Sequence, residues 1–169
     1  MIRKILLQFG ITPLVLACLL CSALAEEKTL KDQIVGTWVA VSGTATLPDG
    51  TKVDRSNSKS MVIYTADGHF AFLSISPDLP RIAANDRAKA TAEEARAVVA
   101  GSIAYLGTYT VNEAEKTIIA KPEASTFANI IGGPEQRRVV TSISADEMRF
   151  TNPRTPAGET LEFAWRRAK

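Results

Sequence analysis

Apolar and polar residues alternate over short segments along most of this chain, and this period of two is typical of β-strands with one buried face. Residues 160–167 show it best, because Leu161, Phe163 and Trp165 fall on one face of that segment. An Asp-Gly turn signal at 67–68 and other short polar turns separate the segments and indicate antiparallel hairpins. The predicted strands span residues 34–47, 61–65, 70–75, 104–111, 117–121, 137–143, 148–151 and 160–167.

One segment of the chain departs from this period and is rich in alanine. Thr91 and Glu94 have the spacing of a capping box, in which each side chain bonds the backbone amide of the other residue at a helix start. They predict a helix over 92–103. Its apolar face is narrow and mostly small, so the helix should lie lightly on the strands and could cover an open end. The residues of that face are Ala92, Ala95, Val99 and Ile103.

About eight strands in sequential hairpins, with one inserted helix, predict an all-β fold that is an antiparallel up-and-down closed barrel. Closure is favoured because it removes the unpaired strand edges that an open sheet exposes. A sandwich of two sheets is the alternative. Two segments stay ambiguous. Residues 26–33 form an entry turn or a short helix, and residues 122–134 form a flexible loop at the mouth or a damaged strand.

The first predicted strand opens with a Gly-x-Trp triplet that ends at Trp38. By alternation, Trp38 shares its face with Ala40, Ser42 and Thr44, while Gly36 leaves room beside the indole. One large ring followed by small or hydroxylated residues suits a barrel that is plugged at one end and roomier further in. The alternative is that Trp38 is an ordinary core aromatic.

Residues 1–25 have the features of a secretory signal peptide, with a basic tip, an apolar stretch and a small-x-small site that ends at Ala25. We expect residues 26–169 to form one domain that is exported, either periplasmic or secreted. Lipoprotein processing at Cys18, which would leave a lipid anchor, is less favoured because apolar residues continue after that cysteine. No second hydrophobic span follows, so no transmembrane segment is expected in the mature chain.

The predicted leader changes what the composition indicates. Both cysteines, Cys18 and Cys21, lie within it, so the mature chain can form no disulfide or thiolate metal site. The leader also holds two of the 20 Lys and Arg residues and none of the 18 Asp and Glu residues, which leaves the mature chain without formal net charge. This balance argues against binding to nucleic acid. The mature chain is long enough for one domain with a sizeable core.

Several motifs together resemble the lipocalin-like domain family of small bacterial and fungal proteins, within the wider calycin group of ligand-binding barrels. The motifs cover most of the mature chain in the family's order. They are Val-Gly-Thr-Trp at 35–38, Met-Val-Ile-Tyr-Thr-Ala-Asp-Gly at 61–68, Ala-Tyr-Leu-Gly-Thr-Tyr-Thr-Val at 104–111, Gln-Arg-Arg at 136–138 and Leu-Glu-Phe-Ala-Trp-Arg-Arg at 161–167. The resemblance implies a closed barrel with a small ligand in its interior.

The resemblance also implies how one end of the barrel is closed. In lipocalins the tryptophan of the Gly-x-Trp triplet sits at the closed end, with an arginine packed across its ring. Trp38 and Arg167 match these two positions best. A guanidinium over an indole is a cation–π pair worth on the order of 1 kcal/mol. The alternative is that Arg166 and Arg167 form a solvated chain end.

The sequence assigns no catalytic residue, metal site or cofactor. His69, the one histidine, follows a hairpin turn, so we expect it to be exposed rather than to act as a general base or haem ligand. Glu93 and Glu94 fit helix capping better than a catalytic pair. No tight cluster of His or carboxylate residues indicates a metal, and the Gly-Gly-Pro at 132–134 is a turn rather than a phosphate-binding loop.

Aromatic and amphipathic residues on the predicted strands supply the candidate ligand-binding site. On the inner face of a barrel they would line an apolar cavity with a few polar anchors, as a small-ligand site requires. The family resemblance makes Arg138 the one charged candidate for the interior. Alternatively, the same rings fill a solid core. The predicted ligand-binding residues are Trp38, Tyr64, Phe72, Tyr105, Tyr109, Arg138 and Trp165.

Three functions are compatible with this pattern. The favoured one is an exported protein that binds a small, largely apolar ligand in its interior. The second is an isomerase- or hydrolase-type enzyme, which needs at least two buried polar groups within hydrogen-bonding reach. The third is an envelope protein that acts through its outer surface or through residues 122–134, and it would show an exposed apolar patch.

Overall fold

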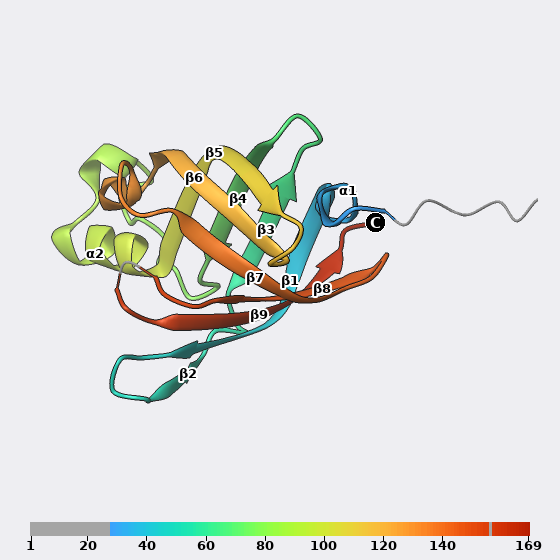
Figure 1. Cartoon of the computed structure of the whole chain (residues 1–169). Helices are drawn as coiled ribbons and strands as arrows, with labels where there is room; N and C mark the ends of the chain where they lie inside the picture. The colour runs from blue at the N-terminus through green and yellow to red at the C-terminus, as the bar shows by residue number, and fades with distance from the viewer. Residues whose placement is uncertain (1–27, 156) are drawn as a thin grey trace, which may run out of the picture.

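The computed structural model describes residues 28–155 and 157–169, so the predicted leader, Cys18 included, lies outside the described residues. The described chain forms one antiparallel sheet that closes on itself, because β1 pairs with β3 on one side and with β9 on the other (Figure 1). The predicted closed barrel is confirmed, and the sandwich alternative is wrong. The strands are β1 (Gly36–Thr46), β2 (Lys52–Asp54), β3 (Lys59–Tyr64), β4 (His69–Ile75), β5 (Ser102–Asn112), β6 (Thr117–Ser125), β7 (Gln136–Ile143), β8 (Glu147–Asn152) and β9 (Thr160–Arg167).

Eight of these strands form the wall, and β2 is an additional strand that the sequence did not predict. It pairs only with the last three residues of β1, Thr44 to Thr46, and so extends that strand as a ribbon beyond the barrel. Three residues are too few to show the alternation on which a strand prediction depends. The remaining connections follow chain order as neighbouring hairpins, as predicted.

Two helices lie at opposite ends of the barrel (Figure 1). The short helix α1 (Leu30–Ile34) confirms the short-helix interpretation of the entry segment, and it buries both Leu30 and Ile34. The longer helix α2 (Ala92–Gly101) begins with the predicted capping box, in which the side chains of Thr91 and Glu94 each bond the other's backbone amide.

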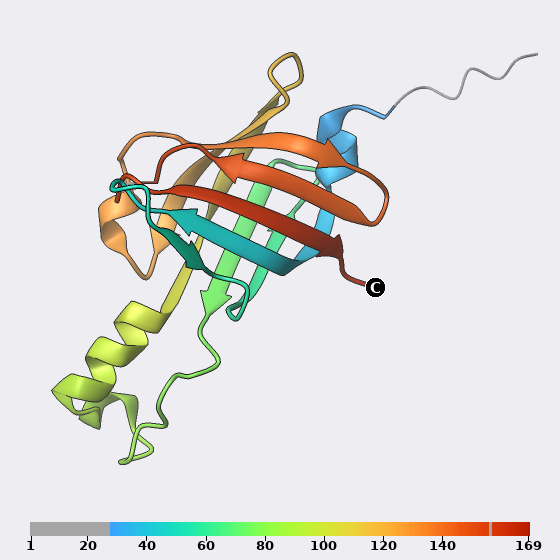
Figure 2. The same cartoon turned by 90° about the horizontal axis from the view of Figure 1, so that it is seen from below.

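The prediction of which face of α2 packs is wrong. Val99 is 76% exposed, and no residue of α2 is buried. The physical reason is visible in Figure 2, where α2 projects away from the barrel wall instead of lying along it. α2 therefore contributes no buried side chain to the end of the barrel beside it. We call this end the mouth; β4 ends and β5 begins there, opposite α1.

The ambiguous segment 122–134 is partly a strand. β6 continues to Ser125, and the short 3₁₀ helix η2 (Ala128–Ile130) follows, with Ile130 buried. The pairing of β5 with β6 shifts by one residue beside Gly107. A Cβ at Gly107 would overlap the backbone carbonyl of Lys121, so only glycine allows the two strands to approach this closely.

A bulge in β1 corrects the prediction of which residues follow Trp38 on its face. The pairing with β9 shifts between Ala40 and Ser42, so the alternation reverses there. Ser42 is exposed, whereas Gly43 and Ala45 are buried on the inner face. The inner residues beyond the tryptophan are therefore small, as predicted, but they are not hydroxylated.

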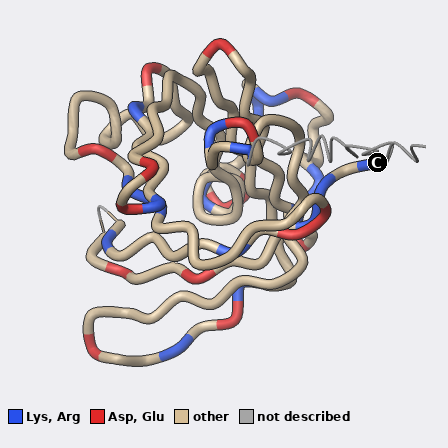
Figure 3. Tube along the Cα trace, turned by 45° about the vertical axis from the view of Figure 1, so that its right-hand side comes forward, with Lys and Arg blue, Asp and Glu red and all other residues tan. Residues whose placement is uncertain are grey.

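Charged residues of both signs are interspersed along the described chain in Figure 3. The ion pairs among these residues are largely solvent-exposed, for example Arg137 with Glu115 at 2.7 Å. Arg138 differs from the other charged residues of the described chain, since its side chain is 1% exposed and lies in the barrel interior. Within residues 28–155 and 157–169, none of the helices has the length and apolar character that a membrane span requires.

Candidate functional site

Trp38 and Arg167 close the end of the barrel beside α1. The indole of Trp38 is fully buried and donates its Nε1–H to the carbonyl oxygen of Ile34 at 2.7 Å. The guanidinium of Arg167 lies 4.1 Å from the centroid of that ring and donates to the carbonyl oxygens of Gln33 and Val35, both at 2.7 Å. The packed role implied for Arg167 is confirmed, and the solvated-terminus alternative is wrong for this residue.

Gly36 lies beside Arg167 at the same closed end of the barrel. Its φ of +130° is in a range that favours glycine, and a Cβ there would lie 2.6 Å from Nη1 of Arg167. The glycine of the triplet therefore leaves room for the guanidinium, whereas the sequence had suggested room for the indole itself.

All seven predicted ligand-binding residues lie in the barrel interior or pack against its core: Trp38, Tyr64, Phe72, Tyr105, Tyr109, Arg138 and Trp165. Five of them are at most 5% exposed, whereas Phe72 and Tyr105 keep part of their surface in solvent. Phe72 is nearer the mouth than Phe70 on β4, and Tyr105 is nearer the mouth than Tyr109 on β5. Solvent therefore reaches the interior from the mouth.

Ring contacts connect the mouth with the centre of the barrel. Phe72 lies 4.9 Å from Tyr105 and 6.3 Å from Trp165, measured between ring centroids. Trp165 in turn lies 5.5 Å from both Phe150 and Phe163. The solid-core interpretation describes the deep half of the interior. Partly exposed rings are found in the mouth half.

Arg138 extends from β7 into these rings. Its Nη2 donates to the hydroxyl of Tyr105 at 2.9 Å, and its Cζ lies 5.6 Å from the centroid of Phe70. Among the described residues, no carboxylate forms an ion pair with it. Burial lowers the pKa of Arg138 while Tyr105 and Tyr64 raise it, and on balance this pKa is raised. Arginine keeps its proton in proteins, so the guanidinium is charged.

Four buried side-chain polar atoms of the described chain have no hydrogen-bond partner: Tyr64 Oη, Arg138 Nη1, Asn152 Oδ1 and Trp165 Nε1. Each such atom costs about 1–3 kcal/mol, and folded proteins contain only a few of them. Here the four residues all lie in the interior of one barrel. Their concentration makes this part of the interior the candidate site, because the described chain itself provides no partner for these atoms.

The buried phenol of Tyr64 leads to a prediction about alkaline pH. Burial raises the pKa of Tyr64 to about 12, although the charge of Arg138 opposes this shift. The unfolded chain releases the same proton near pH 10, so between these two values the unfolded state holds fewer protons than the folded state. We therefore expect this group to lower the free energy of unfolding by about 1.4 kcal/mol per pH unit across that window.

Urea unfolding of the wild type and of Tyr64→Phe at several pH values checks this expectation. The variant should lack this part of the alkaline loss of stability, and its absorbance titration should lack the tyrosine that ionises at the highest pH. Equal alkaline losses of stability in the two proteins would contradict it.

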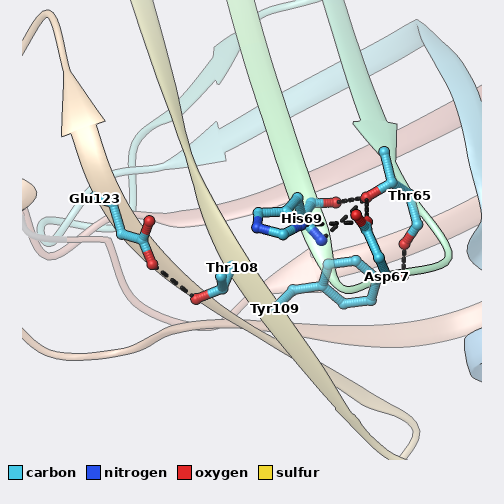
Figure 4. Close-up of polar contacts among 6 residues, drawn as sticks. All are labelled: Thr65, Asp67, His69, Thr108, Tyr109 and Glu123. Carbon is cyan, nitrogen blue, oxygen red and sulfur yellow. Dashed lines mark hydrogen bonds and ion pairs between the residues drawn. The ribbon is translucent and has the colours of Figure 1, made fainter.

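The turn between β3 and β4 carries the one histidine (Figure 4). His69 Nδ1 lies 3.2 Å from Oδ1 of Asp67, and 61% of the His69 side-chain surface is exposed. Thr65 bonds both the Asp67 carboxylate and the backbone of His69, and its carbonyl oxygen accepts from the Tyr109 hydroxyl at 2.8 Å. The expectation that His69 is exposed is confirmed. Tyr109 has its hydroxyl satisfied and lies deep in the interior.

Sequence reasoning missed three residues of the site. Phe70 and Phe150 lie on predicted strands at alternating positions with other inner residues, and this alternation was a usable signal. Asn152 lies one residue beyond the predicted end of its strand. It was missed because asparagine at such a position is typical of a turn. The pairing of β7 with β8, continued by one residue, sets Asn152 across from Arg138, and only the strand register shows this.

Two open hollows, of about 310 and 180 Å³, lie on the outer face of the wall formed by β7, β8, β9 and β1. The exposed residues that line them alternate along the strands with the buried residues of the interior, so both hollows face solvent. Their linings also include Phe150, Phe163 and Trp165, whose rings pack in the interior, so the hollows lie against the same wall as the candidate site. In residues 28–155 and 157–169, no three His, Cys, Asp or Glu side chains are grouped as a metal site would need.

The closed antiparallel barrel, with a tryptophan and an arginine packed together at one end, defines a class of small barrel proteins. The family described as "Lipocalin-like domain" matches residues 35–168, and the chain belongs to this family. The resemblance inferred from the sequence motifs is thereby confirmed.

The chain is also similar to solved barrel structures. A lipocalin-like protein from Bacteroides uniformis is 13% identical, with a TM-score of 0.44, and the match covers 80% of this chain and 99% of that one. A redesigned β-barrel is 15% identical, with a TM-score of 0.44 and coverage of 83% and 96%. A de novo designed fluorescence-activating β-barrel is 14% identical, with a TM-score of 0.42 and coverage of 84% and 100%. A search among curated proteins found no match.

Proposed function

We propose that this chain is an exported protein that binds a small, largely apolar ligand in the mouth half of its barrel. Export follows from the signal peptide expected at residues 1–25. Membership in the lipocalin-like domain family and the closed barrel are compatible with a ligand in the interior. Aromatic walls with a few polar groups are the usual lining of such sites.

The observation that carries the proposal is the set of four unpartnered buried polar atoms among the interior rings. A barrel with a purely structural core would pair these atoms or replace them with apolar groups, because each unmade hydrogen bond lowers stability. Phe72 and Tyr105 provide access, since both are partly exposed at the mouth while their rings contact the interior.

Titration of the mature protein with the neutral dye Nile red, followed by dye fluorescence, tests interior binding. Phe72→Ala should weaken dye binding at least about fivefold, because it removes one of the aromatic rings at the mouth. Leu106→Ala is the matched control. Leu106 is 52% exposed, and its truncation removes apolar surface from β5 away from the interior, so dye affinity should stay unchanged.

The outer wall offers the competing explanation for dye binding. Val39, Met61 and Leu73 are successive cross-strand partners on β1, β3 and β4, and each is 37–39% exposed. This apolar row is the kind of surface that the envelope-protein hypothesis requires. If Leu106→Ala or Met61→Ala weakens dye binding while Phe72→Ala does not, the outer surface is the binding site. Absence of saturable binding to the wild type would overturn the proposal.

The enzyme hypothesis has one observation in its favour, which is the hydrogen bond between Arg138 and Tyr105. Only Arg138 of this pair is buried, since Tyr105 is partly exposed, so the pair falls short of the two buried polar groups that the enzyme hypothesis needs. Acid–base chemistry also needs a group that exchanges protons near the working pH. The buried polar residues of the described interior include no histidine or carboxylate, and the pKa of Tyr64 is about 12. These groups support ligand binding better than proton transfer.

A further inference from the structure

We infer that the mature chain forms a symmetric dimer, in which the outer face of strands β1, β3, β4 and β5 packs against the same face of a second copy. We call this outer face the apolar wall. The dimer is independent of the proposed function, because the apolar wall faces away from the barrel interior. Five of its large side chains are 37–52% exposed: Val39, Met61, Leu73, Ile75 and Leu106.

Strand pairing makes the apolar wall continuous. The four strands are neighbours in the sheet, and their outward side chains meet in rows across it. Neither of its two central rows contains a charged residue. The first row is Val39, Met61, Leu73 and Ala104, and the second is Ile63, Ala71 and Leu106.

The opposite side of the barrel has a different composition. The outward positions of β8 and β9 carry exposed side chains of both charges, namely Glu147, Arg149, Glu162 and Arg166. Polar and charged residues of this kind are usual on the solvated face of an antiparallel sheet. The apolar wall therefore has the composition of a covered surface rather than of a solvated one.

The size of the apolar wall matches what a dimer needs. Its five large side chains together expose on the order of 400 Å² of apolar surface, a size at which patches are often functional. A stable interface buries about 800 Å² per copy, of which roughly two-thirds is apolar in homodimers. The apolar wall supplies most of that apolar area, because Ile63, Ala71 and Ala104 are also partly exposed.

The relief of the apolar wall is complementary to itself. Ala71 lies between Ile63 and Leu106 in its row, and Ala104 lies beside Leu73. Each alanine leaves a recess next to a large side chain, so the large residues of one copy can fill the recesses of the other, as in face-to-face sheet packing. Isologous contacts of this type, in which the same patch serves both copies, are the commonest in oligomers.

Charge and strand pairing also favour a second copy as the occupant. The mature chain carries no formal net charge once the predicted leader is removed, so two copies do not repel each other strongly. A peptide that binds by adding a strand needs a free strand edge. The strands of the apolar wall are paired with neighbours on both sides, so a partner must bind to the face of the sheet.

Sedimentation equilibrium of the mature protein tests the dimer at about 100 μM, a concentration at which a micromolar Kd leaves mostly dimer. The wild type should have twice the mass of one chain. Leu73→Lys should weaken dimerisation at least about a hundredfold, because it places one charge from each copy in an apolar interface. Ile131→Lys is the matched control. Ile131 is a similarly exposed aliphatic residue in the β6–β7 connection, outside the apolar wall, so this variant should remain dimeric.

Met61→Gln is a second, milder variant in the same row, for the case in which Leu73→Lys does not fold. It should weaken dimerisation about fivefold or more. A monomeric wild type would overturn the inference, and so would a dimer that Leu73→Lys and Met61→Gln leave intact. A dimer that only Ile131→Lys dissociates would also overturn it, since the contact would then lie elsewhere. Nile red binding is the separate readout, because a monomeric wild type that binds the dye leaves the proposed function standing.

Discussion

Arg167→Ala is expected to lower the free energy of unfolding by about 2–4 kcal/mol. The substitution removes the cation–π contact with Trp38, which is worth about 1 kcal/mol at a partly exposed site. It also removes hydrogen bonds to the carbonyl oxygens of Gln33, Val35 and Ala145, which join the end of β9 to the residues around α1 and to the β7–β8 turn. Charged hydrogen bonds of this kind contribute about 1.5–3 kcal/mol each before solvent replaces them.

The control for this prediction lies one residue earlier on the same strand. Arg166 is exposed on the outer face, and Arg166→Ala should change the free energy of unfolding by less than about 0.5 kcal/mol. Urea unfolding followed by tryptophan fluorescence measures both variants, since Trp38 reports on the closed end directly. Equal stabilities of the two variants would show that the guanidinium does not hold this end together.

The barrel could be predicted from the sequence because most of its strands face the core on one side and solvent on the other. Residues 160–167 illustrate this, since their alternation gave both the strand and its inner face correctly. The bulge after Ala40 could not be predicted in the same way. It depends on where β9 pairs with β1, and that register is a long-range property that leaves no local trace in Ser42 or Thr44.

The packing of α2 shows a second limit of sequence reasoning. The capping box of Thr91 and Glu94 is local chemistry, and it set the start of the helix correctly. Which side of the helix packs depends instead on how the segment leaves the barrel. Gly101 contacts Leu79 and Ser76 closely, so the helix is fixed at its C-terminal end while Val99 stays exposed. A narrow face of small residues is too weak a signal to decide this.

The candidate site could be predicted in its members but not in its organisation. Alternation placed Tyr105 and Trp165 in the interior, and the family resemblance added Arg138. That Arg138 contacts Tyr105 from two strands away, and that Asn152 lies across from it, follows from the order and register of β5 to β8. That Arg138 Nη1 has no hydrogen-bond partner in the described chain is likewise visible only when every neighbour is known.

Arg138→Met is expected to raise the free energy of unfolding of the ligand-free protein by about 1–3 kcal/mol. The guanidinium is buried with Nη1 unpaired, so its desolvation is only partly offset by the bond to Tyr105 and the contact with Phe70. Methionine has a similar shape and no charge, and replacing buried ionic groups by apolar residues of similar volume is often stabilising by such amounts. A gain in stability on removal of the guanidinium is the pattern expected of a binding residue rather than of a residue that serves the core.

Urea unfolding of the wild type, Arg138→Met and Arg137→Met checks this expectation. Arg137 is exposed, so Arg137→Met should differ from the wild type by less than about 0.5 kcal/mol without ligand. If Arg138→Met instead lowers the free energy of unfolding of the ligand-free protein by several kcal/mol, the role of Arg138 is structural. It then stabilises the barrel through the hydrogen bond to Tyr105 and the contact with Phe70. In that case its charge serves the core rather than a ligand.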